Sequence, residues 1–242
     1  MAWYEAYEKI RPYVVRIETM DGFGTGFLFA YNKDHSVAAL ATASHVIEGA
    51  TDWKQPVKVW HPDSKKTLYL EEDHRVAWLD RVHDAASILI SGDALKLPAE
   101  VLPLLQADRA KRIGVEVGWV GFPRLAPTKI CFFSGAVSAR LAAKASYLID
   151  GVAINGVSGG PVFSELKNAI PEIIGVVAAY MANRRSGESL PGLLQARDLT
   201  AFHKHIQKIK SLDDAKEKER QAQKQIDWSN PSPQIGAPGA GR

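Results

Sequence analysis

The sequence predicts an all-β protein with helices only at its two ends. Ten short apolar runs, broken by turn residues, occupy the chain from about residue 14 to residue 178. Little helical periodicity lies between them, and many short strands at this spacing are typical of a sandwich or barrel. Residues 94–112 contain Pro98 and Pro103 and suit neither a strand nor a clean helix, so we place the division between two β lobes there.

The ten runs divide between these lobes. Each is short and apolar, as strands of a small sheet are. The first lobe is predicted over residues 13–100 and the second over residues 101–197. The expected strands are 14–19, 26–30, 37–42, 57–60 and 86–90 in the first lobe, and 115–120, 136–139, 147–149, 161–163 and 173–178 in the second.

A helix is predicted at each end of the chain. Residues 1–12 carry aromatic and apolar side chains at helical spacing until Pro12 stops the helix. Residues 198–226 form a longer, highly charged helix, with Asp198 as a candidate N-cap. Its apolar face consists of Leu199, Phe202, Ile206 and Ile209. Residues 227–242, rich in proline and glycine, are expected to be disordered.

The composition excludes several classes of protein. Hydrophobic residues make up 46% and charged residues 24% of the chain, which is ordinary for a soluble globular protein. The 30 basic and 27 acidic residues nearly balance, giving a net charge of +3, which does not favour nucleic acid as the main partner. The single cysteine, Cys131, allows no intrachain disulfide and points to a reducing compartment. With no signal peptide or membrane span in the sequence, we predict a cytoplasmic protein.

A glycine-rich turn near the middle of the chain carries the most specific chemical signal. It is Gly156-Val157-Ser158-Gly159-Gly160-Pro161. Ser158 can stand clear of the backbone there, and the N–H groups of Gly156 and Ser158 can converge on one oxygen as an oxyanion hole. A serine is a weak nucleophile that needs a base beside it. The turn therefore predicts a histidine and a carboxylate elsewhere in the chain.

Both partners occur upstream. His45 follows an apolar strand that we expect to deliver its imidazole as the general base. Asp84 stands just before another apolar strand, where it can orient the histidine and stabilise the imidazolium. Taken singly, His45 also fits a structural role and Asp84 a turn or cap. Together the three residues predict a catalytic triad that needs no cofactor or metal ion, with two lobes forming opposite walls of a cleft.

The chain resembles the trypsin-like serine proteases of chymotrypsin fold, and its motifs are closest in style to members of the HtrA type. The resemblance covers most of residues 12–200. The segments that carry it are Gly22–Leu28, Thr42–Val46, Asp84–Leu89, Gly118–Pro123, Ser134–Ser138 and Ala153–Asn155. It implies two antiparallel six-stranded β-barrels with the active site between them. It also implies a base at His45, an orienting acid at Asp84 and a nucleophile at Ser158.

Three departures from the family limit what the resemblance implies. Val157 replaces the aspartate that receives the new N-terminus when secreted members are activated. The cysteines of that branch are missing as well. Nothing after residue 200 resembles a PDZ domain, so peptide sensing of the HtrA kind is in doubt.

The substrate site is predicted from the same resemblance. Val152 and Asn155 would form one wall, Val177, Ala178, Ala179 and Tyr180 another, and Gly192 would close the far side. Val152 stands where trypsin itself carries the acid that selects Arg or Lys, so we expect a small or medium apolar residue before the cleaved bond. The strand around Ala178 can pair with an extended peptide.

Three hypotheses of function remain open. The leading one is an intracellular serine endopeptidase acting on protein or peptide substrates through an acyl-enzyme. A second is a catalytically silent binding module that holds peptides in the same cleft. The third is a protease that stays inactive until a partner docks on the charged C-terminal helix, as in a multiprotein defence or signalling system.

Overall fold

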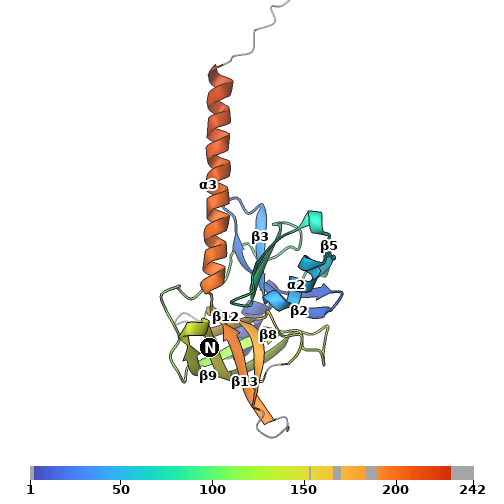
Figure 1. Cartoon of the computed structure of the whole chain (residues 1–242), viewed down its shortest axis with the longest axis vertical. Coiled ribbons are helices and arrows are strands. Elements are labelled where there is room, and N and C mark those ends of the chain that lie inside the picture. The colour runs from blue at the N-terminus through green and yellow to red at the C-terminus, as the bar shows by residue number, and fades with distance from the viewer. Residues whose placement is uncertain (1–2, 153, 166–169, 184–189, 230–242) are drawn as a thin grey trace, which may run out of the picture.

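The computed structural model describes residues 3–152, 154–165, 170–183 and 190–229. Two β-structured halves lie against each other, and one long helix extends beyond them (Figure 1). The strands of the first half are β1 Val14–Thr19, β2 Gly22–Tyr31, β3 Val37–Thr42, β4 Val57–His61, β5 Lys66–Leu70, β6 Val76–Asp80 and β7 Ala85–Ser91. Those of the second are β8 Glu116–Gly121, β9 Cys131–Leu141, β10 Ser146–Asp150, β11 Pro161–Glu165, β12 Pro171–Asn183 and β13 Leu190–Arg197. The α-helices are α1 Trp3–Ile10, α2 Ser44–Asp52 and α3 Thr200–Ser229.

The all-β, two-barrel prediction is confirmed, with a difference in the first half. The second half is a closed antiparallel barrel of order β10-β13-β12-β11-β8-β9. The first is a seven-stranded sheet of order β5-β4-β1-β2-β3-β7-β6, in which the edge strands β5 and β6 do not pair with each other. The apolar runs indicated five strands here and the family resemblance implied six, whereas the sheet has seven, because β5 and β6 had not been recognised in the sequence.

Three strands were missed for physical reasons. Every second residue of β5 is exposed, and β6 is only half-buried along most of its length. Neither segment therefore has the run of apolar residues that would predict a strand. Strand β13 begins Leu-Pro-Gly, a sequence that normally signals a turn. The expected strand at 136–139 is the second half of a longer one, since β9 already begins at Cys131.

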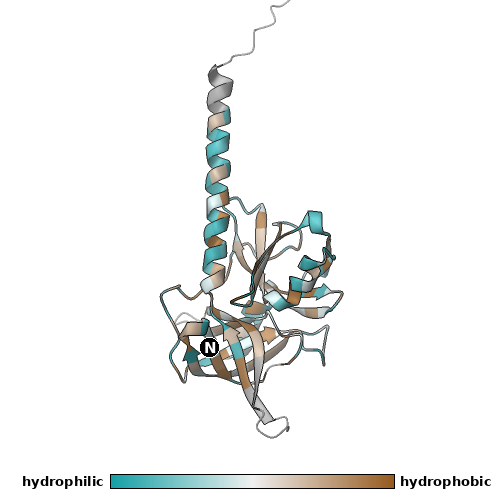
Figure 2. Ribbon diagram, in the orientation of Figure 1, coloured by the Kyte–Doolittle hydropathy of each residue, from teal (hydrophilic) through white to brown (hydrophobic). Residues whose placement is uncertain are grey.

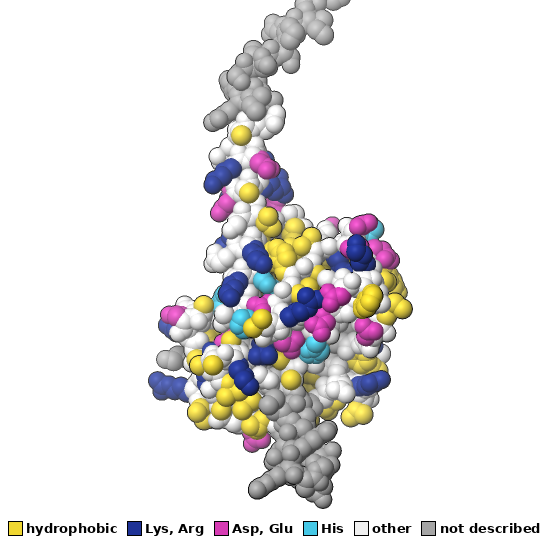
Figure 3. All heavy atoms as spheres, in the orientation of Figure 1, with side chains coloured by type: hydrophobic (Ala, Val, Ile, Leu, Met, Phe, Trp, Pro, Cys, Tyr) yellow, Lys and Arg dark blue, Asp and Glu magenta, His cyan; other side chains and the backbone are white. Residues whose placement is uncertain are grey.

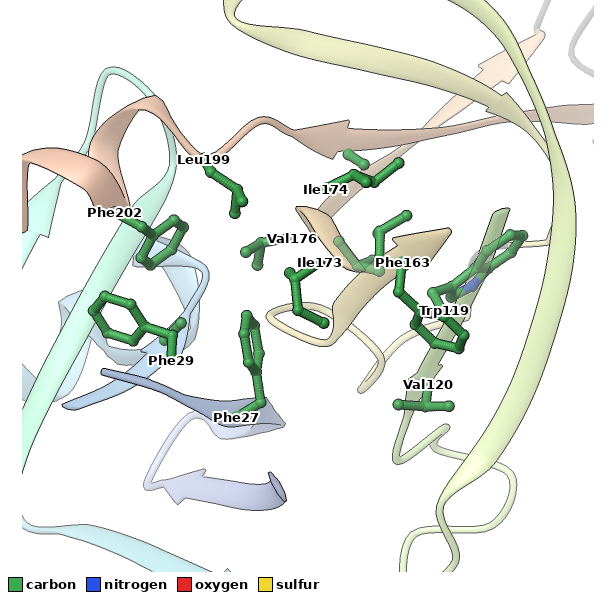
Figure 4. Close-up of a cluster of buried hydrophobic side chains, with 14 of the residues drawn as sticks. Phe27, Phe29, Trp119, Val120, Phe163, Ile173, Ile174, Val176, Leu199 and Phe202 are labelled. Atoms are coloured by element: carbon green, nitrogen blue, oxygen red, sulfur yellow. The ribbon is translucent and has the colours of Figure 1, made fainter. Parts of the chain in front are cut away.

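The two halves share one hydrophobic core. Phe27 of β2 points toward Ile173 and Val176 of β12, and Phe29 of the same strand lies beside Phe202 (Figure 4). Phe202 of α3 closes this cluster, its ring centroid 5.3 Å from that of Phe29 in an edge-on arrangement. The core thus fixes the relative position of the two sheets.

Helix α1 packs on the closed barrel. The ring of Trp3 lies 5.5 Å from that of Phe132 and 6.1 Å from that of Phe163, measured between centroids. The helix ends at Ile10 and continues as a short 3-10 turn, Arg11–Tyr13, that contains Pro12.

Helix α3 begins as the sequence predicts and ends slightly later. The Asp198 carboxylate accepts the N–H of Thr200 at 3.0 Å and pairs with the Arg140 guanidinium. The predicted apolar face is the buried one, with Leu199, Phe202 and Ile209 almost fully inaccessible and Ile206 packed beside them. The helix runs to Ser229, three residues past the expected end, and residues 230–242 of the expected disordered tail lie outside the described residues.

The last contacts of α3 with the first sheet are polar. The Asp213 carboxylate accepts the Lys33 N–H at 2.7 Å, and the Lys33 ammonium lies 2.8 Å from Glu217. Past Glu217 the helix is hydrophilic and projects away from the barrels, carrying charges of both signs (Figures 2 and 3). No helix in the described part of the chain is long and apolar enough to cross a membrane.

A buried histidine anchors α3 on the first sheet. His205 is 4% exposed, its Nδ1 lies 2.6 Å from the Ser87 hydroxyl of β7, and its ring packs against Trp78 and Phe202. Burial lowers the pKa of His205 to about 4, and the neighbouring Lys208 and Lys204 act in the same direction against Asp80. His205 is therefore neutral in the folded protein at pH 7, and a hydrogen bond joins its Nδ1 to the Ser87 hydroxyl.

Acid should weaken the fold through this residue. Between pH 6.5 and 4 an unfolded chain protonates His205 while the folded chain does not, so stability present above pH 6.5 is lost as the pH falls. We expect His205 to account for about 2 kcal/mol of lost unfolding free energy between pH 7 and pH 5. Urea titrations of the wild type and of His205→Gln should show a shallower pH dependence in the variant. His74→Gln, which removes an exposed histidine, is the control and should keep the pH dependence of the wild type. If the unfolding free energy of His205→Gln depended on pH as strongly as that of the wild type, this role of His205 would be contradicted.

Candidate active site

Paired strands bring His45 and Asp84 together. Strands β3 and β7 are antiparallel neighbours in which Thr42 faces Ala86. Asp84 directly precedes β7, as predicted. His45 follows β3 but lies in the first turn of α2, a helix that the sequence had not indicated. The expected delivery of His45 by a strand end is thus replaced by a strand-to-helix junction.

The carboxylate of Asp84 holds His45 through two donors. Asp84 Oδ1 accepts the backbone N–H of His45 at 3.1 Å, and both carboxylate oxygens lie 3.0 Å from His45 Nδ1. Asp84 adopts a left-handed backbone with φ of +48°, a conformation that aspartate tolerates better than most residues. Because Nδ1–H donates to the carboxylate, Nε2 carries the lone pair and is free to accept a proton.

The electrostatics suit a general base. The hydrogen bond that His45 donates to the Asp84 carboxylate raises the pKa of His45 above 6.5. Burial of the imidazole opposes this rise, and the negative charges of Asp84 and Glu48 add to it. The His45 side chain remains 42% exposed while that of Asp84 is 19% exposed, so the imidazole has one solvent-facing edge.

The serine turn has the backbone that its glycines permit. Gly156 has φ of +95° and Gly159 has φ of +87°, a region that other residues rarely adopt. A Cβ on Gly159 would lie 2.0 Å from the Thr25 carbonyl oxygen, and one on Gly156 2.3 Å from that of Phe122. Both positions therefore require glycine.

Two N–H groups of the serine turn have no acceptor among the described residues. The carbonyl of Asn155 accepts the N–H of Arg124 at 2.7 Å, and since the peptide is trans, the N–H of Gly156 points the opposite way. The N–H of Val157 closes the turn on the Ile154 carbonyl at 3.1 Å. No acceptor among the described residues takes the N–H of Gly156 or Ser158. Unpaired N–H groups are one requirement of the predicted oxyanion hole.

Thr25, which sequence reasoning had missed, ties this turn to the first sheet. Its N–H donates to the Ser158 carbonyl at 2.8 Å and its hydroxyl to the Gly156 carbonyl at 2.8 Å. The same hydroxyl accepts the Phe122 N–H at 3.0 Å. Thr25 is completely buried, so none of these groups has water as an alternative. A threonine between two glycines, Gly24 and Gly26, was the only sequence signal for it.

Ser158 and His45 share a pocket without a direct hydrogen bond. Both line a space of about 230 Å³ together with Gly156. The described side chains show no hydrogen bond between the Ser158 hydroxyl and His45. In free enzymes such a bond is often long and tightens only when substrate is bound.

The residues predicted to bind substrate differ in how far their side chains are exposed to solvent. Val152 is 59% exposed and Asn155 and Ala179 are exposed, whereas Val177 and Ala178 are buried at 2% and 4%. Both backbone groups of Val177 are bonded to the serine turn, to Gly159 and Gly160. The backbone of Tyr180 lies in β12 and that of Gly192 in β13. The structure does not test their substrate roles, which stay predictions.

The residue before the serine contributes to the core. Val157 is completely buried in the apolar cluster of the closed barrel. No carboxylate stands at this position to receive a new N-terminus, in agreement with the departure noted in the sequence.

A comparison with protein families settles the assignment. The profile of the trypsin-like peptidase domain matches residues 24–170, which include His45, Asp84 and Ser158. The chain belongs to the trypsin-like peptidase family. A search of curated proteins finds no match.

Solved structures support the fold of the peptidase. A serine endoprotease from Yersinia pestis aligns with a TM-score of 0.63 and 21% identity, over 86% of this chain and 66% of that one. The protein Deg5 aligns with a TM-score of 0.61 and 20% identity, over 83% of this chain and 90% of that one. The peptidase spans just under two thirds of the Yersinia chain. The predicted chymotrypsin-like fold is confirmed.

Replacing the Thr25 hydroxyl should damage the turn without removing a triad residue. Thr25→Val keeps the shape but leaves the Gly156 carbonyl and the Phe122 N–H unpaired, at a cost of about 1–3 kcal/mol for each buried group. We expect a lower urea midpoint and slower labelling of Ser158 by a fluorophosphonate. Thr25→Ser keeps the hydroxyl and should restore the labelling rate. Equal labelling rates for the valine and serine variants would show that Thr25 does not position the turn.

Proposed function

We propose that the peptidase cleaves peptide bonds through a Ser158–His45–Asp84 triad and an acyl-enzyme. The observation that carries the proposal is the pairing of Asp84 with His45 Nδ1 beside a serine turn with two free N–H groups. His45 Nε2 removes the proton of Ser158 as its oxygen attacks the substrate carbonyl. The same nitrogen then returns the proton to the leaving amine, and water hydrolyses the acyl-enzyme by the reverse sequence.

The oxyanion of the tetrahedral intermediate would be bound by the N–H groups of Gly156 and Ser158. Each such donor is worth about 3–4 kcal/mol of transition-state stabilisation. Hydrogen bonds from Arg124 and Thr25 already hold the turn, which favours a hole that is preformed before substrate arrives.

The acyl half of the substrate would lie along β12. This strand pairs with β11 only up to Val176, while its pairing with β13 continues to Asn183. Its edge from Ala178 onward therefore meets no other described strand, and an extended peptide can add there. With Val152 in place of an acid, we propose a small or medium apolar residue before the cleaved bond.

The setting and the partners remain part of this proposal. A single cysteine supports a reducing, cytoplasmic location. The exposed stretch of α3 after Glu217 is the surface we propose for a regulatory protein, because residues 218–223 are exposed and packed on neither barrel. A silent peptide-binding module is the alternative, which a reactive Ser158 would exclude.

The nucleophile is tested by comparing the wild type with Ser158→Ala. We expect fluorophosphonate to label Ser158 in the wild type alone, and cleavage of a proteome digest to fall by at least about 10⁴-fold in the variant. Mass spectrometry of the same digest reports the residue before each cleaved bond. Folded wild-type protein that neither labels nor cleaves would favour the binding module. Cleavage mainly after Arg or Lys would refute the apolar preference.

The activity should depend on the protonation of His45. Because its pKa is raised above 6.5, the base is lost as the pH falls through that raised value, so kcat/KM should have an acidic limb above pH 6.5. Asp84→Asn removes the main cause of the rise, so the limb should move to lower pH while the rate falls by about 10⁴-fold. An acidic limb that stays in place in Asp84→Asn would contradict this assignment.

A further inference from the structure

The pocket at the catalytic serine extends to one side only. It is lined by residues 19 and 21–23 at the junction of β1 and β2, by His45, Val46 and Gly49 of α2, and by Asn155, Gly156 and Ser158 of the serine turn. No residue of β12 lines it. It is therefore separate from the strand edge along which the acyl half of a substrate would lie.

The pocket faces the half of the substrate that leaves first. A base that protonates the leaving amine must stand on the side of that amine, and His45 forms a wall of this pocket. Since the acyl half lies on the β12 side of Ser158, the residues after the cleaved bond enter the space between His45 and Phe23. This step rests on the proposed function.

Asp21 gives this space a negative charge. It lies in the turn between β1 and β2, and a Cβ on Gly49 would approach its Oδ2 to 2.5 Å. The carboxylate thus rests on α2 where glycine leaves room, one helical turn after His45. Asp21 forms no ion pair with any described residue. The pocket lining contains no lysine or arginine.

The rest of the wall suits the stem of a long cationic side chain. Phe23 packs against Gly156, since a Cβ there would lie 2.7 Å from its ring, and Val46 of α2 lines the opposite part. Apolar walls accommodate the methylene groups of lysine or arginine while the charge reaches a carboxylate. The nearby Arg16 guanidinium stacks on Phe23 at 4.2 Å but is paired with Glu18 at 2.8 Å.

We propose that this pocket selects a lysine or arginine at one of the first two positions after the cleaved bond, with Asp21 as the specificity-determining residue. The peptidase would then combine an apolar preference before the bond with a cationic preference after it. Because the Asp21 carboxylate is exposed, the preference is moderate and sensitive to salt.

The test uses quenched-fluorescence peptides that share the sequence before the cleaved bond. Lys, Gln or Glu is placed at each of the first two positions after it, with alanine at the other. We expect kcat/KM to favour Lys about threefold over Gln and about tenfold over Glu at one of these positions. Asp21→Asn should remove the preference for Lys over Gln at that position.

Glu48→Gln is the matched control. It removes a negative charge that acts on His45 but does not line the pocket, so the preference for Lys should survive. Cleavage of all peptides at similar rates by the wild type would overturn the role of Asp21 and leave the proposed function intact. The same holds for a preference that persists in Asp21→Asn. Absence of both cleavage and Ser158 labelling would refute the proposed function and this inference with it.

Discussion

The geometry of the site depends on the hydrogen bonds of one buried residue, Thr25. His45 and Asp84 lie next to strands of the first sheet, in α2 and just before β7, whereas Gly156 and Ser158 lie in the turn that precedes β11 of the closed barrel. Thr25 joins these parts because it lies on β2 and bonds to the carbonyls of both Gly156 and Ser158. The hydrophobic cluster that includes Phe27, Ile173 and Val176 packs the two sheets against each other, and the directional hydrogen bonds of Thr25 fix the position of the serine turn relative to β2.

The sequence was informative where function is local. The serine turn could be recognised because its glycines adopt backbone angles and close approaches that other residues cannot. The face of α3 that packs on the barrels was predictable because its apolar residues repeat at helical spacing. Asp84 could be placed before a strand for the same reason, since the apolar run of β7 has a clear beginning.

Features that depend on contacts between distant parts of the chain could not be predicted from the sequence. Strands β5 and β6 form because the neighbouring strands β4 and β7 supply their hydrogen bonds. Their own residues are too polar to predict a strand from the sequence. Helix α2 is only nine residues long, so its stability comes from packing rather than from propensity. The role of Thr25 depends on a partner 131 residues away, and the position of Asp21 depends on the glycine at residue 49.

Helix α3 has a mechanical consequence beyond its buried first half. The residues that follow Glu217 add about 18 Å of helix beyond the last contact with the first sheet. A charged helix of this kind acts as a semi-rigid spacer, unlike a flexible linker. A protein that bound to this part of the helix would therefore be held away from the pocket that His45 and Ser158 line.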